Sequence, residues 1–287
     1  MEIKTYKRLP YGETNFESVR TRNYAYVDKT RFIGLLEKES NTRQFFIRPR
    51  KFGKSLFLSM LMNYYDLLRT DRFRELFGGL YIGENPTPLK NNYAVIEFDF
   101  SGLDTSSPEN FIKSFNWRVQ VLVQQFLKYY ESVFDQADSL IDYIVKRDIG
   151  VASLEVAYGA ARAANVKMLI IIDEYDHFAN DLIAMGVEDV YKKMVHANGL
   201  VRDFYEMLKM GAKSVVDRIF ITGISPVMLD DLTSGFNIAE NLTLNIRYNN
   251  MMGFTEQEVE WLMDETGVNR DFIIVDMKVV LQRLPFQ

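Results

Sequence analysis

The chain has 287 residues, of which 47% are hydrophobic, 14% aromatic and 25% charged, and its formal net charge is −5 at pH 7. This composition excludes a disordered chain and allows one large α/β domain or two small ones. The absence of cysteine and the presence of only two histidines exclude a disulfide framework, a thiolate metal site and a histidine-rich metal cluster.

The charge and the apolar runs also limit the partners. A net charge of −5 argues against wholesale electrostatic binding of nucleic acid. The apolar runs are too short to span a membrane, and residues 1–7 lack the apolar region of a secretory signal. We therefore expect a cytoplasmic protein with no membrane partner.

Residues 1–40 predict a lead-in segment that packs on the core. Residues 9–12 (Leu-Pro-Tyr-Gly) indicate a turn, and residues 24–27 indicate a short edge strand. Asp28 is placed to cap a helix whose apolar residues lie at helical spacing over 32–36. The sharper alternative is that this segment folds over the base of a bound nucleotide.

The core begins with a strand, a basic turn and a helix. Residues 43–48 predict the first strand and residues 54–68 a helix that opens with Gly53-Lys54-Ser55. This order is the context that a phosphate-binding loop requires. The strict pattern G-x-x-x-x-G-K-[ST] fails, because Arg48 stands where the first glycine is usual.

Each residue type in this loop suits a bound phosphate. Gly53 lets the backbone approach the phosphates, and the N–H groups at the start of the helix point at an anion. Lys54 supplies a positive charge for the β- and γ-phosphates, and Ser55 a hydroxyl for Mg²⁺. Alone, Gly53-Lys54-Ser55 could simply start a helix. The full predicted binding loop comprises Arg50, Lys51, Phe52, Gly53, Lys54, Ser55 and Leu56.

Residues 69–164 continue the α/β pattern. Residues 69–92 form a glycine- and proline-containing connector, and residues 93–100 predict a second strand in which Glu97 indicates an edge position. Helices are predicted over 108–130, 139–146 and 153–164.

An unbroken apolar run then ends in two acids. Residues 167–172 predict a buried parallel strand, followed directly by Asp173-Glu174. In a Walker B strand, Asp173 holds Mg²⁺ and Glu174 polarises the attacking water. Any buried strand can end in charge, but this run together with Gly53-Lys54-Ser55 indicates a nucleotide site. His177 is expected to be a hydrogen-bonded structural residue.

The last part of the core supplies a helix and two strands. A helix is predicted over 187–210 and strands over 217–223 and 242–246. Thr222 ends its strand on the ligand side, as Asp173 does, so it is a candidate sensor of the γ-phosphate or the attacking water. The alternative is that Thr222 is a β-branched residue that only favours a strand.

A helical lid is expected to begin after the core. Thr255 and Glu258 predict a capping box at the start of a helix. Val259, Leu262 and Met263 form an apolar stripe without an obvious partner, so we expect this end to dock loosely or to be covered by a second copy.

Six motifs occur along the chain: Tyr26-Val27-Asp28-Lys29-Thr30, Arg48-Pro49-Arg50-Lys51-Phe52-Gly53-Lys54-Ser55-Leu56, Ile172-Asp173-Glu174-Tyr175-Asp176, Thr222-Gly223-Ile224-Ser225-Pro226, Ser234-Gly235-Phe236-Asn237-Ile238-Ala239 and Gly253-Phe254-Thr255. Together they resemble the AAA-ATPase-like family of bacterial P-loop ATPases. The resemblance implies that the Arg-Pro-Arg-Lys-Phe-Gly-Lys-Ser loop is the family's own Walker A motif.

The resemblance also implies a domain plan. Many members of the family continue into a domain similar to PD-(D/E)XK nucleases, whereas residues 280–287 resemble nothing expected, so we carry over no nuclease activity. We predict a lead-in segment over 1–40, a P-loop core over 41–250 and a truncated lid over 251–287.

The predicted fold is a three-layer α/β P-loop NTPase of the additional-strand, AAA-like class, with a mainly parallel sheet and an incomplete helical lid. The leading function is Mg-dependent ATP hydrolysis coupled to a conformational switch, with an unknown protein partner or self-association. The alternative is a non-hydrolysing nucleotide-gated interaction module, supported by the missing first glycine and by the lack of an obvious arginine finger. Arg202, Arg218 and Arg247 are all candidate fingers, and none stands out. Nucleic acid binding through Arg48, Arg50 and Lys51 is a weaker third hypothesis.

Overall fold

A five-stranded parallel β-sheet forms the centre of the computed structural model, with the strand order β2-β3-β4-β1-β5. The structure describes residues 6–177, 179–180, 199–226 and 238–268. The strands are β1 (Arg43–Ile47), β2 (Tyr93–Asp99), β3 (Lys167–Asp173), β4 (Val216–Gly223) and β5 (Glu240–Asn241).

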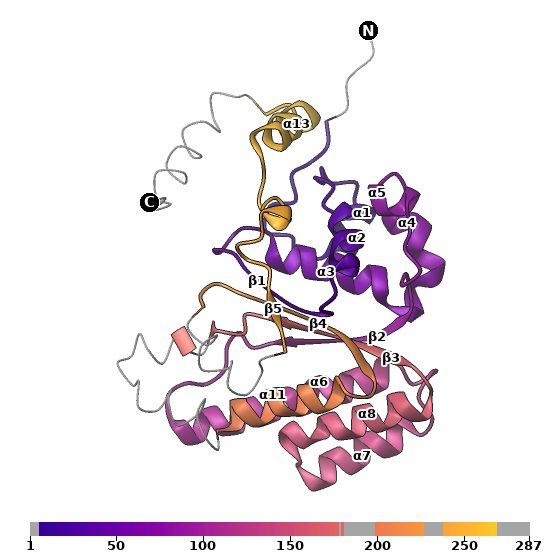
Figure 1. Ribbon diagram of the computed structural model, residues 1–287, viewed down its shortest axis with the longest axis vertical. Coiled ribbons are helices and arrows are strands. Elements are labelled where there is room, and N and C mark those ends of the chain that lie inside the picture. The colour runs from indigo at the N-terminus through magenta and orange to yellow at the C-terminus, as the bar shows by residue number, and fades with distance from the viewer. Residues whose placement is uncertain (1–5, 178, 181–198, 227–237, 269–287) are drawn as a thin grey trace.

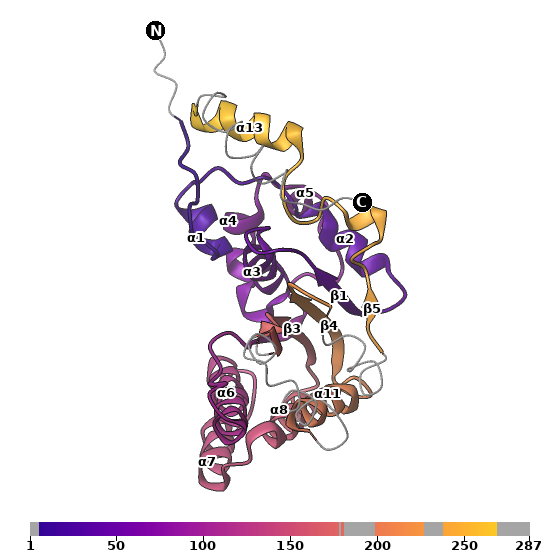
Figure 2. The same cartoon turned by 90° about the vertical axis from the view of Figure 1, so that its left-hand side faces the viewer.

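Helices lie on both faces of this sheet (Figures 1 and 2). One face carries α1 (Phe16–Thr21), α2 (Arg31–Lys38), α3 (Lys54–Tyr65), the 3₁₀ helix η1 (Leu67–Arg72), α4 (Phe73–Phe77) and α5 (Tyr81–Glu84). The other carries α6 (Pro108–Tyr129), α7 (Ala137–Arg147), the 3₁₀ helix η2 (Gly150–Ala152), α8 (Ser153–Ala163) and α11 (Leu200–Gly211). The 3₁₀ helix η3 (Ile246–Tyr248) and α13 (Glu256–Thr266) follow β5.

The apolar run of β3 is continuous because both of its faces are covered. Leu169 and Ile171 join the core on the α3 face, whereas Ile170 and Ile172 join the core on the α6 face. Successive side chains of a strand point to opposite faces, so a strand buried on both sides has no polar alternation. The parallel sheet that the sequence predicted is confirmed.

The strand order brings three chain segments to one edge. β4 lies between β1 and β3, and Phe46 of β1 is the register partner of Thr222 of β4. All the described strands are parallel, so the carboxyl ends of β1, β3 and β4 share an edge. Ligands of open α/β sheets bind at this edge. The expectation that Asp173 and Thr222 finish beside the loop after β1 is confirmed.

Some predicted boundaries are wrong. Residues 24–27 form no strand. The fifth strand is 240–241 and not 242–246, because the chain leaves the sheet after Leu242 and exposes Leu244 to solvent. The connector 69–92 contains α4 and α5, and α3 ends at Tyr65, where the Asp66 carboxylate caps the start of η1. Thr30 is the N-cap of α2, while Asp28 accepts hydrogen bonds from Thr30 and from the Tyr81 N–H.

Part of the prediction falls outside the described residues: positions 187–198 of one helix, 234–237 of one motif and all of 269–287. In the part of the chain that the structure describes, no helix is long and apolar enough to cross a membrane.

The helix α13 is held at both ends by the N-terminal segment. Its Thr255–Glu258 capping box is confirmed. Lys29 Nζ lies 2.6 Å from Glu258 Oε1 in the first turn, and Lys7 pairs with Glu265 at 3.2 Å in the last. Met263 is only 7% exposed. The expectation that this apolar stripe lacks a partner within the chain is therefore wrong at Met263.

Candidate nucleotide-binding site

The loop between β1 and α3 has the geometry of an anion cradle. Lys51 and Gly53 have left-handed backbones (φ +69° and +83°), and Gly53 immediately precedes the first residue of α3. Among the described residues no side chain caps this helix, so its first N–H groups have no side-chain acceptor there. Such groups and the helix dipole favour a negatively charged ligand.

Arg48 stands where the first glycine of the loop is usual, and its side chain binds the backbone of a neighbouring segment. Its φ is not positive, so the position does not need a glycine. Its guanidinium donates to the carbonyl of Thr243 (3.2 Å) and lies 4.2 Å from the centre of the Phe46 ring. Arg48 therefore ties the loop to the segment after β5, instead of joining Arg50 and Lys51 in a patch that faces phosphate.

Lys54 lies under the loop and is 6% exposed. Its Nζ donates to the carbonyls of Arg48 (3.0 Å) and Pro49 (3.1 Å). Burial lowers the pKa of Lys54, and the charges of Asp173 and Glu174 oppose that shift. The lysine is therefore within the electrostatic field of the acids at the end of β3.

Ser55 and Asp173 meet although they are 118 residues apart. The Ser55 hydroxyl donates to Asp173 Oδ2 at 2.7 Å. Burial raises the pKa of Asp173, and this hydrogen bond opposes the rise. The two predicted metal-binding residues are thus in direct contact.

Two further carboxylates lie on the same face as Asp173. Glu97 and Asp99 alternate along β2, and Asp99 is the register partner of Asp173. Burial, followed by the charges of Asp173 and Asp99, raises the pKa of Glu97 to about 7. β2 is an edge strand of the described sheet, as the sequence position of Glu97 predicted. Sequence reasoning missed that Glu97 lies close to Asp173. The spacing of Glu97 and Asp99, two residues apart on one strand, is the sequence feature that could have indicated this cluster of carboxylates.

Glu174 follows β3 in a left-handed backbone conformation, with φ of +49°. Its N–H donates to Asp173 Oδ1 at 2.9 Å, and its Oε2 lies 3.8 Å from His177 Nε2. The His177 N–H donates to the Glu174 carbonyl, so that histidine is part of the same turn.

Thr222 is fully buried, and its hydroxyl donates to the Phe46 carbonyl at 2.8 Å. The hydroxyl therefore donates its proton to a backbone carbonyl of β1, while its oxygen can still accept a hydrogen bond. A sensor role requires this hydroxyl to rotate, and it stays a prediction.

The arginine candidates separate by position. Arg218 is 8% exposed and lies near the start of β4, at the opposite end from Thr222. A finger must reach another molecule or an open site, so the hypothesis is wrong for Arg218. Arg202 pairs with Glu206, and Arg247 pairs with Glu39.

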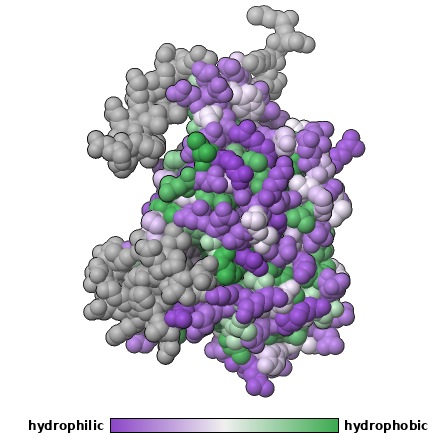
Figure 3. All heavy atoms as spheres, in the orientation of Figure 1, coloured by the Kyte–Doolittle hydropathy of each residue, from purple (hydrophilic) through white to green (hydrophobic). Residues whose placement is uncertain are grey.

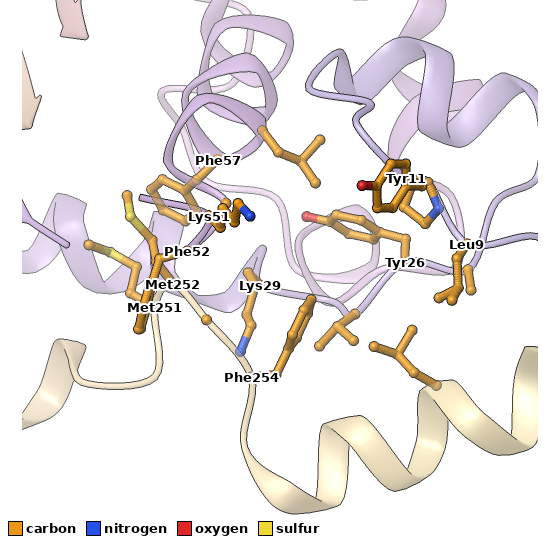
Figure 4. A pocket seen from close by; sticks show the side chains of 17 residues that line it. Leu9, Tyr11, Tyr26, Lys29, Lys51, Phe52, Phe57, Met251, Met252 and Phe254 are labelled. Atoms are coloured by element: carbon orange, nitrogen blue, oxygen red, sulfur yellow. The ribbon is translucent and has the colours of Figure 1, made fainter. Parts of the chain in front are cut away.

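An apolar pocket of about 330 Å³ opens beside the loop (Figure 4). Small-molecule sites in proteins span about 300 to 1,000 Å³. Phe52 and Lys51 of the loop form one side, while Tyr26 comes from the N-terminal segment and Met252 from residues 249–255, the segment before α13 that we call the hinge. Four of the lining residues, Lys51, Phe52, Gly53 and Leu56, belong to the binding loop that the sequence predicted. Sequence reasoning missed the others, such as Tyr26 and Met252, because they come from segments far apart in the chain. It did raise the alternative that the N-terminal segment folds over a base.

The donor set at the edge of the sheet fits a hydrated Mg²⁺ ion. Magnesium in nucleotide sites uses one or two protein oxygens together with phosphate oxygens and water. Ser55 Oγ and Asp173 Oδ2 supply such oxygens. Within the described residues no group of three or more His, Cys, Asp or Glu side chains could hold a metal without such outside ligands.

The chain is 26% identical over 275 residues to a protein of Azotobacter chroococcum mcd 1 whose name is "Uncharacterized protein in vnfD 5'region". The alignment covers 93% of this chain and 47% of that protein, so the chain spans about half the length of this curated relative. No solved structure is significantly similar to the chain.

The family comparison is more informative. A family model described as "Predicted AAA-ATPase" matches residues 10–233. The matched range contains the loop after β1, the acidic end of β3 and Thr222. Since the match covers most of the sequence, this chain belongs to the predicted AAA-ATPase family.

Proposed function

We propose that this protein binds ATP with Mg²⁺ at the edge formed by β1, β3 and β4, and hydrolyses it. The observation that carries the proposal is the 2.7 Å hydrogen bond between Ser55 and Asp173. It joins the start of the loop helix to the acidic end of a buried strand, which is the pair of elements that phosphoryl-transfer sites combine.

The same arrangement supports the additional-strand class of P-loop fold. β4 separates the loop strand β1 from the acidic strand β3. Helices cover both faces, which gives three layers (Figure 1). We propose residues 41–250 as the ATPase core, 1–40 as its lead-in segment and 251–287 as the start of a lid.

The loop residues bind the phosphates in this proposal. The N–H groups of Phe52, Gly53 and Lys54 face the anion, and Lys54 leaves its carbonyl partners to contact the β- and γ-phosphate oxygens. Arg50 and Lys51 add positive charge, while Leu56 packs beside the bound nucleotide. Ser55 and Asp173 hold Mg²⁺, which neutralises charge on the phosphates.

Glu174 orients and polarises the attacking water, and Thr222 senses the γ-phosphate. Their contribution is positioning and electrostatics, as in other phosphoryl-transfer sites. Burial raises the pKa of Asp173, the Ser55 hydrogen bond opposes this rise, and the positive charge of a bound Mg²⁺ would favour the ionised carboxylate further.

The apolar pocket is our candidate for the base and sugar of the nucleotide. Lys51, Phe52 and Gly53 line it, so its mouth adjoins the proposed phosphate site. Aromatic walls such as Phe52 and Tyr26 provide flat apolar surface of the kind on which bases stack. Leu262 extends the lining onto α13.

The hinge before α13 gives a route from the nucleotide to the lid. The Gly253 N–H donates to the Phe52 carbonyl at 2.9 Å. Lys29 donates to the Asn250 carbonyl and to Glu258, which joins the N-terminal segment to both hinge and lid. A change in the loop on ATP binding would therefore reach α13 through backbone contacts, which supports a conformational switch.

The direct test is ATP turnover by the purified protein with and without Mg²⁺. We expect phosphate release in Mg²⁺ and none after chelation with EDTA. Ser55→Ala should raise the Mg²⁺ concentration for half-maximal turnover by roughly tenfold or more, because one metal ligand is lost. Ser153→Ala, at the start of α8 on the other face of the sheet, is the matched control. Unchanged Mg²⁺ dependence in Ser55→Ala would contradict the metal assignment.

A second test separates the base from the phosphates. Leu262→Glu places a charge in the apolar pocket and should weaken Mg-ATP binding roughly tenfold, while binding of inorganic tripolyphosphate is unchanged. Trp261→Glu is the matched control, because it introduces the same charge on the same helix at a residue that lines a separate depression. Isothermal titration calorimetry measures all the affinities. Equal losses for ATP and tripolyphosphate in Leu262→Glu would contradict the assignment of the pocket.

A further inference from the structure

One fully buried carboxylate, Asp176, joins the segments that follow β3 and β4. Asp176 Oδ1 accepts the N–H of Ile224 at 3.1 Å, and Oδ2 accepts the N–H of Ser225 at 2.6 Å. The Asn180 amide also donates to Oδ2, at 2.9 Å. Backbone N–H groups of one segment and the Asn180 amide of the other thus converge on a single carboxylate, so the two segments are firmly joined.

The packing around this carboxylate leaves no free space. A Cβ on Gly223 would lie 2.3 Å from Asp176 Oδ1 and 2.4 Å from the Tyr175 ring. The Tyr175 hydroxyl donates to the Ser225 carbonyl at 2.6 Å, and the backbone N–H of Tyr175 donates to the Thr222 carbonyl at 3.2 Å. Residues 175–176 are thus anchored to the end of β4 by both side chains and backbone.

This anchor lies directly after Glu174, whose backbone is left-handed. Such a conformation is strained in a residue other than glycine and persists only when its surroundings hold it. The carbonyl of Gly223 accepts the N–H of Arg48 at 3.2 Å, so the end of β4 is also joined to the loop after β1. The direction of Glu174 relative to the phosphate loop therefore depends on the contacts of Asp176.

We propose that Asp176 is a positioning residue: by clamping the segment after β3 to the end of β4, it fixes Glu174 for the attacking water. Asp176 itself makes its contacts with Ile224, Ser225 and Asn180 and acts through Glu174. This inference rests on the proposed ATP hydrolysis.

The test is Asp176→Asn, which keeps the shape but presents an NH₂ group to backbone N–H donors. We expect kcat for ATP to fall roughly 10- to 100-fold, as a small misplacement of a reacting group does. The Kd for Mg-ATP should change far less than kcat, because Asp176 makes no hydrogen bond with the described loop residues that bind phosphate and acts on Lys54 only through its charge. In a Glu174→Gln background, Asp176→Asn should cause no further fall, since the two residues act as one unit.

Tyr130→Phe is the matched control for lost stability. The Tyr130 hydroxyl donates to Asp66 and accepts from the Val95 N–H, far from Glu174, so its removal also breaks a buried hydrogen-bond network. Thermal unfolding compares the variants, and kcat should fall only in Asp176→Asn. Should Asp176→Asn not fold, Tyr175→Phe removes a single bond of the same clamp and should lower kcat at unchanged Kd.

Three outcomes overturn the inference alone: wild-type kcat in the clamp variants, additive losses in the double variant, or an equal fall of kcat in Tyr130→Phe. Absence of ATP turnover in the wild type would refute the proposed function, and this inference with it.

Discussion

Replacing Lys54 with alanine should abolish tight binding of Mg-ATP. The lysine is the buried cation at the start of α3, and within the described residues its Nζ donates to the two carbonyls of Arg48 and Pro49. Each hydrogen bond to a charged group contributes about 1.5 to 3 kcal/mol, so losing the phosphate contacts should weaken binding on the order of 100-fold. Isothermal titration calorimetry of wild type and variant measures the effect.

Lys167→Ala is the matched control, because it removes the same charge at the opposite end of β3. Its affinity for Mg-ATP should equal that of the wild type. Circular dichroism of Lys54→Ala checks that the loop change leaves the fold intact. Wild-type affinity in folded Lys54→Ala would contradict the whole nucleotide-site assignment.

Replacing Glu174 with glutamine should stop hydrolysis while sparing binding. The side chain lies after β3 beside Asp173 and His177, and glutamine keeps its size but cannot polarise a water as a carboxylate does. Loss of such a group lowers the rate by about 10² to 10⁴. A single-turnover assay with excess protein separates the chemical step from binding, and the Kd for Mg-ATP should not change.

Glu155→Gln is the control, an exposed acid on α8 on the other face of the sheet. It should hydrolyse ATP at the wild-type rate. Wild-type turnover in Glu174→Gln would assign the water-activating role elsewhere. A wild type that binds Mg-ATP without hydrolysing it would instead favour the nucleotide-gated interaction module, and hydrogen exchange of α13 with and without ATP would then measure the gating.

The placement of Arg48 illustrates how a motif search alone can mislead. The position lacks the glycine of the strict phosphate-loop pattern, which weakened the ATPase hypothesis and favoured the non-hydrolysing alternative. In the structure Arg48 has an ordinary backbone, and its side chain reaches the segment after β5. The loop closes around Lys51 and Gly53, whose left-handed conformations make the turn.

The sequence by itself determined the elements that carry the site. Gly53 with a positive φ, the helix that begins at Lys54 and the buried strand ending at Asp173 all follow from local rules. Glycine adopts a positive φ without the strain that other residues incur, and a continuous apolar run needs cover on both faces. These rules depend on near neighbours in the chain, so one sequence suffices to apply them.

Only the tertiary structure decided which of these elements meet. The Ser55–Asp173 contact, the pocket between Tyr26, Phe52 and Met252, and the Asp176 clamp each join segments from distant parts of the chain. Periodicity records that a face is buried but not what buries it, because that depends on strand order and on how the loops close. The site is therefore made of locally predictable parts whose relative position is a property of the whole sheet.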